Sequence, residues 1–314
     1  MDVSALSDFC ARIIKNCSKV IIGKDDEIFD VLVCFLCSGH IMLQDIPGTG
    51  KTMLLRAFAK TIGGSFKRIQ FTPDVLPSDL TGINFYNQKT GEFEFRPGPL
   101  FANMILADEI NRATPRTQSS LLESMAERQV TVDGTTHLMV DPFMIMATQN
   151  PLESHGVFPL PEAQKDRFFM RISLGYMTRG EEISVISGRD TLEIVNELGP
   201  QTTHEDISGL KKLCREIEVS GDVVEYMMDI IQRTRQDSRI RIGASTRGAI
   251  ALYRASQASA GLDGRDFVLP EDVRRVAPKV LAHRLSLSGI TGTGDDLDII
   301  EDILGTTKVP LENI

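Results

Sequence analysis

Between residues 40 and 174, short apolar runs alternate with helix-like segments, which is typical of a parallel sheet covered by helices. Five runs have the length and composition of buried strands: 40–44, 65–71, 103–108, 143–149 and 168–174. The segments between them include KTMLLRAFAK and a helix that starts at Pro115 with Thr114 as its N-cap. The pattern predicts an α/β core with a parallel five-stranded sheet between helices.

Two segments interrupt this alternation. Residues 83–95 alternate apolar and polar positions around a Lys-Thr-Gly turn, and residues 128–140 do so around Asp133-Gly134. Each segment predicts a β-hairpin inserted into the main fold. Surface decoration and a projecting functional element are both compatible with these patterns.

After residue 177 the strand signals fade and helical patterns follow, as in VVEYMMDIIQRTRQ and STRGAIALYRASQASAGL. Pro270, with acidic residues behind it, opens a further helix, and DDLDIIEDIL forms a last amphipathic segment. We place a domain boundary near Thr178. It divides the chain into an α/β domain, residues 1–177, and a helical domain, residues 178–314, each of ordinary domain size.

The composition places the chain among soluble globular proteins, with 42% hydrophobic and 25% charged residues. A net charge of -9 gives no general attraction for phosphate backbones, so we expect no nucleic-acid partner. Neither a signal-peptide core nor an apolar run of roughly 20 residues appears, and we expect a cytoplasmic protein without a transmembrane segment. Cys34 and Cys37 form a CxxC, but they lie in an apolar run that predicts core packing, and no second cysteine pair accompanies them. The histidines show no pair at ligand spacing.

The segment DIPGTGKT, residues 45–52, lies between the first predicted strand and a helix, where a phosphate-binding loop is built. Lys51 places a charge at the β- and γ-phosphates, Thr52 offers a hydroxyl to Mg²⁺, and Gly48 and Gly50 let the backbone approach closely. Asp45 replaces the first glycine of the general pattern, and aspartate tolerates the left-handed backbone conformation better than most residues. The predicted ATP contacts of this segment are Asp45, Pro47, Gly48, Thr49, Gly50, Lys51, Thr52 and Met53.

Two polar groups follow later strands. In MILADEIN, residues 104–111, Asp108 suits coordination of Mg²⁺ through water, and Glu109 suits activation of the attacking water as general base. The alternative for this pair is a solvated acidic turn. Asn150, at the end of ATQN, is placed to hold the water or the γ-phosphate, although an asparagine before proline is also an ordinary turn residue.

Together, DIPGTGKT, FEFRPGPLFANMILADEINRATPRTQSSLLESMAERQVTVDG, MATQNPLESHGVFPLPEAQKDRFFMRI and GASTRGAIAL resemble the MoxR-type AAA+ ATPases of the helix-2-insert clade. The resemblance covers nearly the whole chain and implies an AAA+ P-loop core with a C-terminal all-α lid. The family often carries aspartate at the position of Asp45. Ser154 and His155 depart from the residues expected there.

The resemblance also implies roles for single residues. Asn150 resembles the sensor-1 residue, Arg247 the sensor-2 arginine that reaches from the lid, and Arg167 the arginine finger that acts on the neighbouring subunit's nucleotide. Judged without the resemblance, both arginines fit ordinary surface or salt-bridge positions. Arg112 and Arg116 are further candidates for contacts across a subunit interface. Ile21, Ile22 and Gly23 are candidates for contacts beside the adenine, although core packing fits them equally.

The implied function is Mg²⁺-dependent ATP hydrolysis in a homo-oligomeric, hexameric ring that remodels or matures client proteins, with a von Willebrand factor A-domain protein as partner. The two hairpins would lie near the central pore. Two alternatives stay open. One is a nucleotide-gated scaffold with weak hydrolysis, and the other is a DNA-directed AAA+ motor or loader, which a salt-dependent shift on mixing with DNA would reveal.

Overall fold

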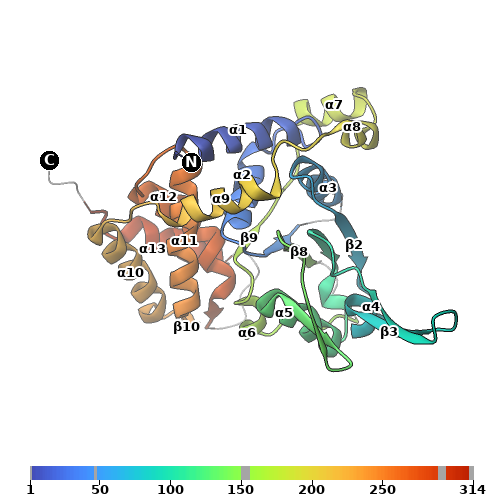
Figure 1. The fold of residues 1–314 in the computed structure, drawn as a ribbon. Coiled ribbons are helices and arrows are strands. Elements are labelled where there is room, and N and C mark those ends of the chain that lie inside the picture. The colour runs from blue at the N-terminus through green and yellow to red at the C-terminus, as the bar shows by residue number, and fades with distance from the viewer. Residues whose placement is uncertain (1, 46–47, 150–155, 289–294, 311–314) are drawn as a thin grey trace.

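The computed structural model describes residues 2–45, 48–149, 156–288 and 295–310 (Figure 1). At its centre lies one parallel sheet in the order β2-β5-β8-β1-β9. Its strands are β1 (Ile41–Gln44), β2 (Phe66–Gln70), β5 (Met104–Asp108), β8 (Met144–Gln149) and β9 (Met170–Ile172). All five predicted strands are therefore confirmed. The most apolar runs, β5 and β8, occupy inner positions, whereas β2 is an edge strand with exposed polar residues.

Successive residues of the central strands face opposite sides of the sheet and belong to separate hydrophobic clusters. On one side lie α1 (Ser4–Cys17), α2 (Asp25–Leu36) and α3 (Lys51–Thr61), and on the other α4 (Pro77–Thr81) and α5 (Pro115–Glu127). The predicted start of α5 is confirmed, because the Thr114 side chain accepts a hydrogen bond from the Thr117 amide. A short 3-10 turn, Ile110–Arg112, and α6 (Glu162–Lys165) complete this part of the chain.

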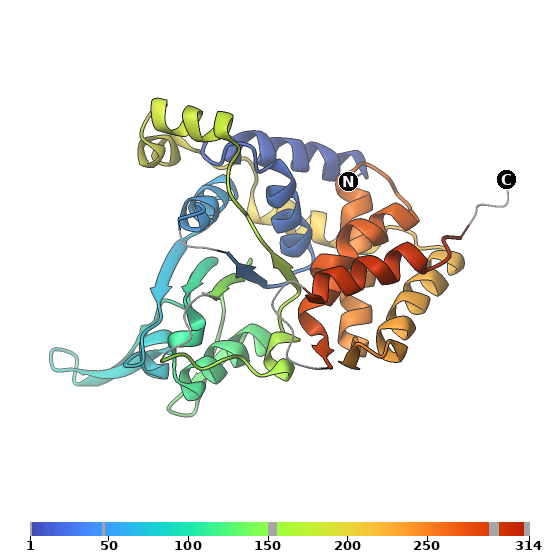
Figure 2. The same cartoon turned by 180° about the vertical axis from the view of Figure 1, so that it is seen from behind.

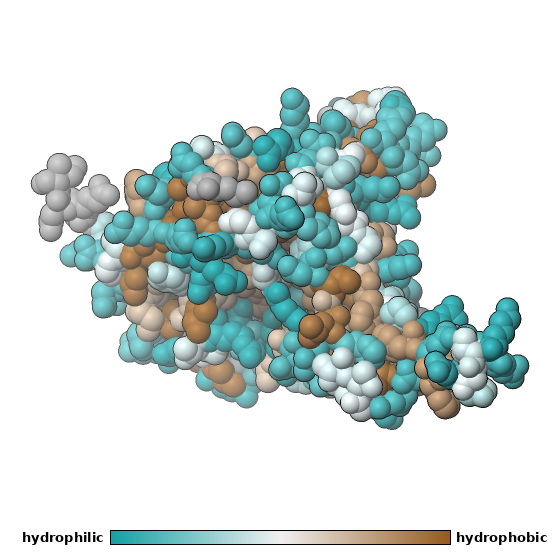
Figure 3. Space-filling model, viewed as in Figure 1, coloured by the Kyte–Doolittle hydropathy of each residue, from teal (hydrophilic) through white to brown (hydrophobic). Residues whose placement is uncertain are grey.

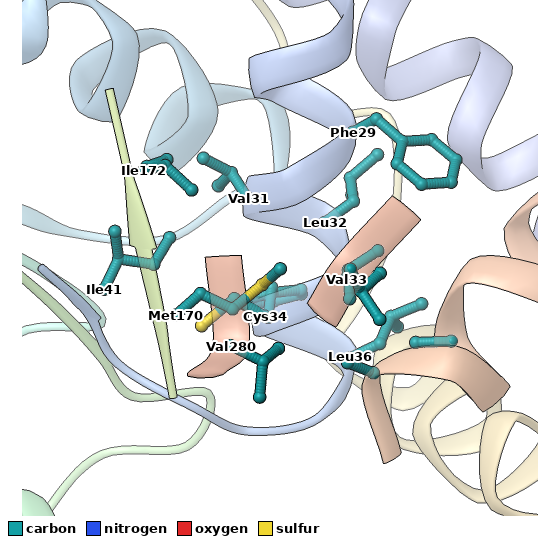
Figure 4. Close-up of a cluster of buried hydrophobic side chains, with 14 of the residues drawn as sticks. Phe29, Val31, Leu32, Val33, Cys34, Leu36, Ile41, Met170, Ile172 and Val280 are labelled. Atoms are coloured by element: carbon teal, nitrogen blue, oxygen red, sulfur yellow. The ribbon is translucent and has the colours of Figure 1, made fainter. Parts of the chain in front are cut away.

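The helix α2 is apolar around most of its circumference because it is buried between the sheet and the later helices. In Figure 4 its side chains form one cluster with Met170 of β9 and Val280 of α12 (Pro270–Leu281). Cys34 is fully buried in this cluster, so the predicted core packing is confirmed. Cys37, at the end of the same helix, donates to the Arg254 carbonyl. All five cysteines are free thiols.

The chain after residue 178 is helical, as predicted. Its helices are α7 (Arg179–Ser187), α8 (Thr191–Glu197), α9 (His204–Arg215), α10 (Gly221–Gln236), α11 (Thr246–Leu262), α12 (Pro270–Leu281) and α13 (Asp295–Thr306). A 3-10 turn (Ala282–Arg284) and two short antiparallel strands, β10 (Ile240–Ile242) and β11 (Ser286–Leu287), were not predicted. Figure 2 shows α9 to α13 gathered beside the sheet, with α7 and α8 apart from them near α3.

The two predicted domains share one hydrophobic cluster, which contains residues of α1, α2 and α3 together with residues of α10 to α13. The division at residue 177 therefore stays a prediction. Thr178 itself caps α7, and Glu181 completes the capping box. Among the described residues, no helix is long and apolar enough to cross a membrane.

Both predicted hairpins are present: β3 (Gly82–Asn87) with β4 (Glu92–Pro97), and β6 (Gln129–Val132) with β7 (Thr135–Leu138). Asp133 and Gly134 both have positive φ, as a two-residue hairpin turn requires. The hairpins contact each other, because the Phe95 and His137 rings stack with centroids 3.8 Å apart. Both project from the core (Figure 1), and the tip of the longer one is hydrophilic (Figure 3).

Candidate nucleotide site

The carboxyl ends of β1, β5 and β8 open into a cleft of about 280 Å³. Because parallel strands end at the same edge of a sheet, residues from distant segments meet there. The cleft is lined by Asp45, Gly48, Thr49, Gly50, Lys51, Thr52, Arg68, Asp108, Glu109, Thr148 and Gln149. The predicted loop and the predicted acidic pair therefore face one space. Pro47 and Asn150 lie outside the described residues.

The glycine loop has the backbone shape that a phosphate cradle needs. Gly48 and Gly50 both have φ of 87°, in the left-handed region that favours glycine. A Cβ atom on Gly48 would meet no other atom within 4 Å, and one on Gly50 would reach only the Ile21 side chain, at 4.0 Å. The space above the loop is thus open to a ligand. Lys51 begins α3, so the amides of the first helical turn face an anion bound there.

Asp45 has a different task from the one that we predicted. Its φ is not positive, so its tolerance of the left-handed conformation is not what allows the loop to form. Its buried carboxylate accepts hydrogen bonds from the Ser173 hydroxyl (2.7 Å), the Leu174 amide (2.7 Å) and the Gly175 amide (3.0 Å). Asp45 therefore ties the start of the loop to the segment that follows β9. Its carbonyl oxygen accepts from Lys51 Nζ at 3.2 Å.

Both carboxylate oxygens of Asp108 are engaged. Oδ1 accepts a hydrogen bond from the Thr148 hydroxyl at 2.6 Å. Oδ2 accepts from Arg68 on β2, through Nη2 at 2.6 Å and Nε at 3.2 Å. Neither Arg68 nor Thr148 was predicted. Arg68 was detectable only as a polar residue of the 65–71 strand, and Thr148 only as a neighbour of Asn150 in ATQN.

Glu109 is also fixed by side chains of its own chain. Its Oε2 accepts from Gln70 Nε2 at 2.8 Å and from Arg112 Nη1 at 3.0 Å, and its amide donates to Thr148 Oγ1 at 2.8 Å. The Glu109 backbone has φ of 58°, a conformation that is costly for a side-chain-bearing residue and is concentrated at functional sites. Arg112, which we predicted at a subunit interface, thus contacts the acidic pair of its own chain, and Arg116 is exposed on α5.

The residues fit Mg²⁺ bound together with a nucleotide better than a metal held by protein alone. Among the described residues, no cluster of three or more histidine, cysteine or acidic side chains could hold a metal ion. Mg²⁺ in nucleotide sites is typically held by one or two protein oxygens and by phosphate oxygens and water. Thr52 and Asp108 face the same cleft and supply such oxygens.

The segment predicted to lie beside the adenine is close to the loop. Ile21 is buried and lies next to Gly50, as noted above. Gly23 has φ of 71°, and a Cβ there would overlap Glu181 of α7, 1.8 Å from its Oε1. Ile22 and Met53 do not line the cleft, and Met53 packs against the main hydrophobic cluster.

The two predicted catalytic arginines are not in this cleft. Arg167 is exposed and donates to the Leu122 carbonyl at 2.8 Å. Arg247, whose side chain is 58% exposed, lies 3.7 Å from Asp166. Arg167 precedes β9 in the chain, and Arg247 contacts Asp166, which also precedes β9. Both arginines therefore lie near the amino ends of the strands, opposite the cleft. The structure brings Arg247 to the neighbour of Arg167 and not to the nucleotide loop of its own chain.

A sheet of this strand order, with a glycine loop between β1 and α3 and an acidic pair after β5, defines a P-loop ATPase fold of the AAA+ class. Residues 40–170 match the family described as "ATPase family associated with various cellular activities (AAA)", and residues 232–303 match the AAA lid domain. The structure is similar to a crystal structure of a protein from Cytophaga hutchinsonii, with a TM-score of 0.90 and 37% sequence identity. The match covers 98% of this chain and 97% of the Cytophaga chain.

Similar sequences give the family. The chain is 45% identical to the Bacillus subtilis (strain 168) protein YeaC, over 98% of this chain and 97% of that protein. It is 38% identical to Chaperone MoxR1 of Mycobacterium tuberculosis, with 96% and 82% covered, and 32% identical to Protein MoxR of Paracoccus denitrificans, with 86% of each covered. The chain belongs to the MoxR-type AAA+ ATPases.

Proposed function

We propose that this protein hydrolyses ATP in an Mg²⁺-dependent reaction and uses the cycle to remodel or mature client proteins. One observation carries the catalytic part: Lys51, Thr52, Asp108 and Glu109 line one cleft at the edge of the sheet. Mg²⁺ bound with ATP would neutralise charge on the phosphate oxygens. Asp108 and Thr52 would hold the ion, and Lys51 would reach the β- and γ-phosphates from the first turn of α3.

Glu109 acts as the general base in this proposal. Its carboxylate lies at the cleft, and hydrogen bonds from Gln70 and Arg112 hold one oxygen, Oε2. The other oxygen is then oriented to take a proton from water that attacks the γ-phosphate. Thr148 joins Glu109 to Asp108 through a single hydroxyl, so the base and the metal ligand keep a fixed relative position.

The proposal is tested with Glu109→Gln, which keeps the shape of the side chain and one acceptor oxygen but removes the base. We expect unchanged binding of a fluorescent ATP analogue and a fall in steady-state phosphate release of about 10²- to 10⁴-fold. Glu123→Gln, which removes an exposed carboxylate on α5, is the matched control. Equal rates in wild type and Glu109→Gln would refute hydrolysis by this site and leave the scaffold function.

We further propose that Arg167 and Arg247 act between subunits of a ring. Both lie near the amino ends of the strands, on the side away from the cleft of their own chain. An arginine supplied by a neighbour stabilises the charge that develops on the transferred phosphoryl group. In this arrangement a single chain has an incomplete catalytic site, and hydrolysis depends on assembly. Mass measured by light scattering, with and without ATP, tests the assembly directly.

For client contact, we propose the paired hairpins. On the longer hairpin, Phe93 is 73% exposed and Tyr86 is 53% exposed, and their rings are in edge contact. A projecting apolar surface of this kind suits extended or partly unfolded protein segments. Pull-down with Glu109→Gln should retain clients, along with a von Willebrand factor A-domain partner, and adding Phe93→Ser should release the clients. Equal client recovery with and without Phe93→Ser would contradict this role.

A further inference from the structure

Arg68 holds Oδ2 of Asp108, the carboxylate oxygen that Thr148 of the core does not bind. Oδ1 is bound by Thr148, which is 2% exposed and part of the central strand β8. Among the residues that the structure describes, Oδ2 is bound by the guanidinium of Arg68, through two of its nitrogens. The Arg68 side chain is 49% exposed and stands on the edge strand β2, so it can change its conformation without disturbing the core. Of the two partners of Asp108, Arg68 is the one that can leave.

We propose that Arg68 competes with Mg²⁺ for Oδ2 of Asp108 and releases this oxygen when the phosphates of a bound nucleotide offer the guanidinium another anion. This inference rests on the proposed function of the cleft. The guanidinium of Arg68 can bind a phosphate as well as a carboxylate. Oδ2 of Asp108, by contrast, cannot serve the metal fully while it also accepts hydrogen bonds from Arg68. Arg68 lines the same cleft as Lys51, so its new partner would be within the same space.

The exchange has a clear electrostatic consequence. While Arg68 stays on Asp108, the acidic residue is neutralised and presents little repulsion to an incoming triphosphate. When Arg68 moves to the phosphates, Asp108 becomes available as a ligand, and one ion pair replaces another at small net cost. A chain without Arg68 leaves Asp108 uncompensated beside the phosphates. Nucleotide binding should then depend more strongly on Mg²⁺, because the metal would be the remaining source of neutralising charge.

The test measures nucleotide affinity, independently of turnover. The dissociation constant of a fluorescent ADP analogue is measured in EDTA and in saturating Mg²⁺, and the ratio of the two constants gives the metal dependence. In Arg68→Gln we expect this ratio to rise about two- to fivefold over wild type, the range in binding that a half-exposed ion pair supports. The Mg²⁺ concentration that half-saturates binding should fall by a similar factor.

Two further variants separate this role from a general loss of charge. Arg68→Lys keeps the charge but not the two-pronged contact, and we expect an intermediate ratio. Lys67→Gln removes a cation from the opposite face of the same strand and should leave the ratio unchanged. A ratio in Arg68→Gln equal to that of wild type would overturn the inference while nucleotide binding itself stands. Failure of the wild-type chain to bind the analogue would instead refute the proposed function, and this inference with it.

Discussion

Replacing Asp45 by glycine restores the general P-loop pattern, yet we expect it to destabilise this protein. The reason is the carboxylate of Asp45, which accepts hydrogen bonds from Ser173, Leu174 and Gly175. The residue is only 5% exposed. Glycine would remove all of these bonds at once. It would also detach the start of the phosphate-binding loop from the segment after β9, so the position of the loop would be less well defined.

The loss of stability depends on which of the three donors can form a hydrogen bond to water once the Asp45 carboxylate is gone. The Ser173 side chain is exposed and can turn to solvent, and Gly175 is partly exposed. Leu174 is 1% exposed, and its amide would stay buried without a partner. A buried donor left without a partner costs about 1–3 kcal/mol. Each lost hydrogen bond to a charged acceptor costs about 1.5–3 kcal/mol, and a new hydrogen bond to water offsets part of that cost. We therefore expect a loss of roughly 2–4 kcal/mol.

Thermal and urea unfolding, followed by circular dichroism at fixed pH, measure this loss. For a chain of this size, roughly 2 °C of melting temperature corresponds to 1 kcal/mol, which gives a decrease of about 4–8 °C. Ser173→Ala, which removes only one of the bonds, should cost less than half as much. Asp266→Gly, at an exposed loop aspartate, controls for the flexibility that glycine adds. An Asp45→Gly protein as stable as the Asp266→Gly protein would refute the reasoning.

Three other changes have defined outcomes. Burial lowers the pKa of His40 from the ordinary 6.5 to about 4. The free energy of unfolding that depends on a neutral His40 is therefore complete above pH 6.5 and is lost as the pH falls towards 4. His40→Asn should flatten the pH dependence of the melting temperature between these two pH values. Thr148→Val should cost about 1–3 kcal/mol and slow phosphate release, because the amide of Glu109 and Oδ1 of Asp108 each lose a partner. Arg167→Ala should keep ATP binding and lose about 10³-fold in turnover, and mixing it with Glu109→Gln should restore part of the activity.

Each of these variants has a matched control on the same protein. His204→Asn changes an exposed histidine and should leave the pH dependence of melting as it is. Thr131→Val removes an exposed hydroxyl from a hairpin strand and should affect neither stability nor turnover. Lys165→Ala removes a cation near Arg167. Unchanged turnover in Arg167→Ala, or no recovery in the mixture, would remove the assignment of a residue that acts between subunits.

The local patterns of the sequence were sufficient for the main features of the fold. Apolar runs predicted the inner strands β1, β5 and β8, because a buried parallel strand must be apolar on both faces. Turn chemistry at Asp133-Gly134 and the cap at Thr114 predicted a hairpin and a helix start, since both depend on neighbours in the chain. The two short strands β10 and β11 were missed because they carry only a few residues and pair across a long separation in sequence.

Local sequence patterns could not predict which side chains contact Asp108 and Glu109. Arg68 and Gln70 meet Asp108 and Glu109 only because β2 pairs with β5 in a register that sets Gln70 opposite Asp108. A shift of one residue would turn both side chains to the other face of the sheet. The same limitation applied to Arg247, whose contact with Asp166 depends on how α11 packs against the core.

By itself, then, the sequence determined the elements and the phosphate-binding loop, because helix periodicity, strand hydrophobicity and glycine conformation are properties of residues close together in the chain. Only the tertiary structure decided which charges neutralise which, how Asp45 anchors the loop and which edge of the sheet each arginine occupies. Those contacts join segments that are distant in sequence, and their energies depend on register, burial and distance, which exist only after the chain has folded.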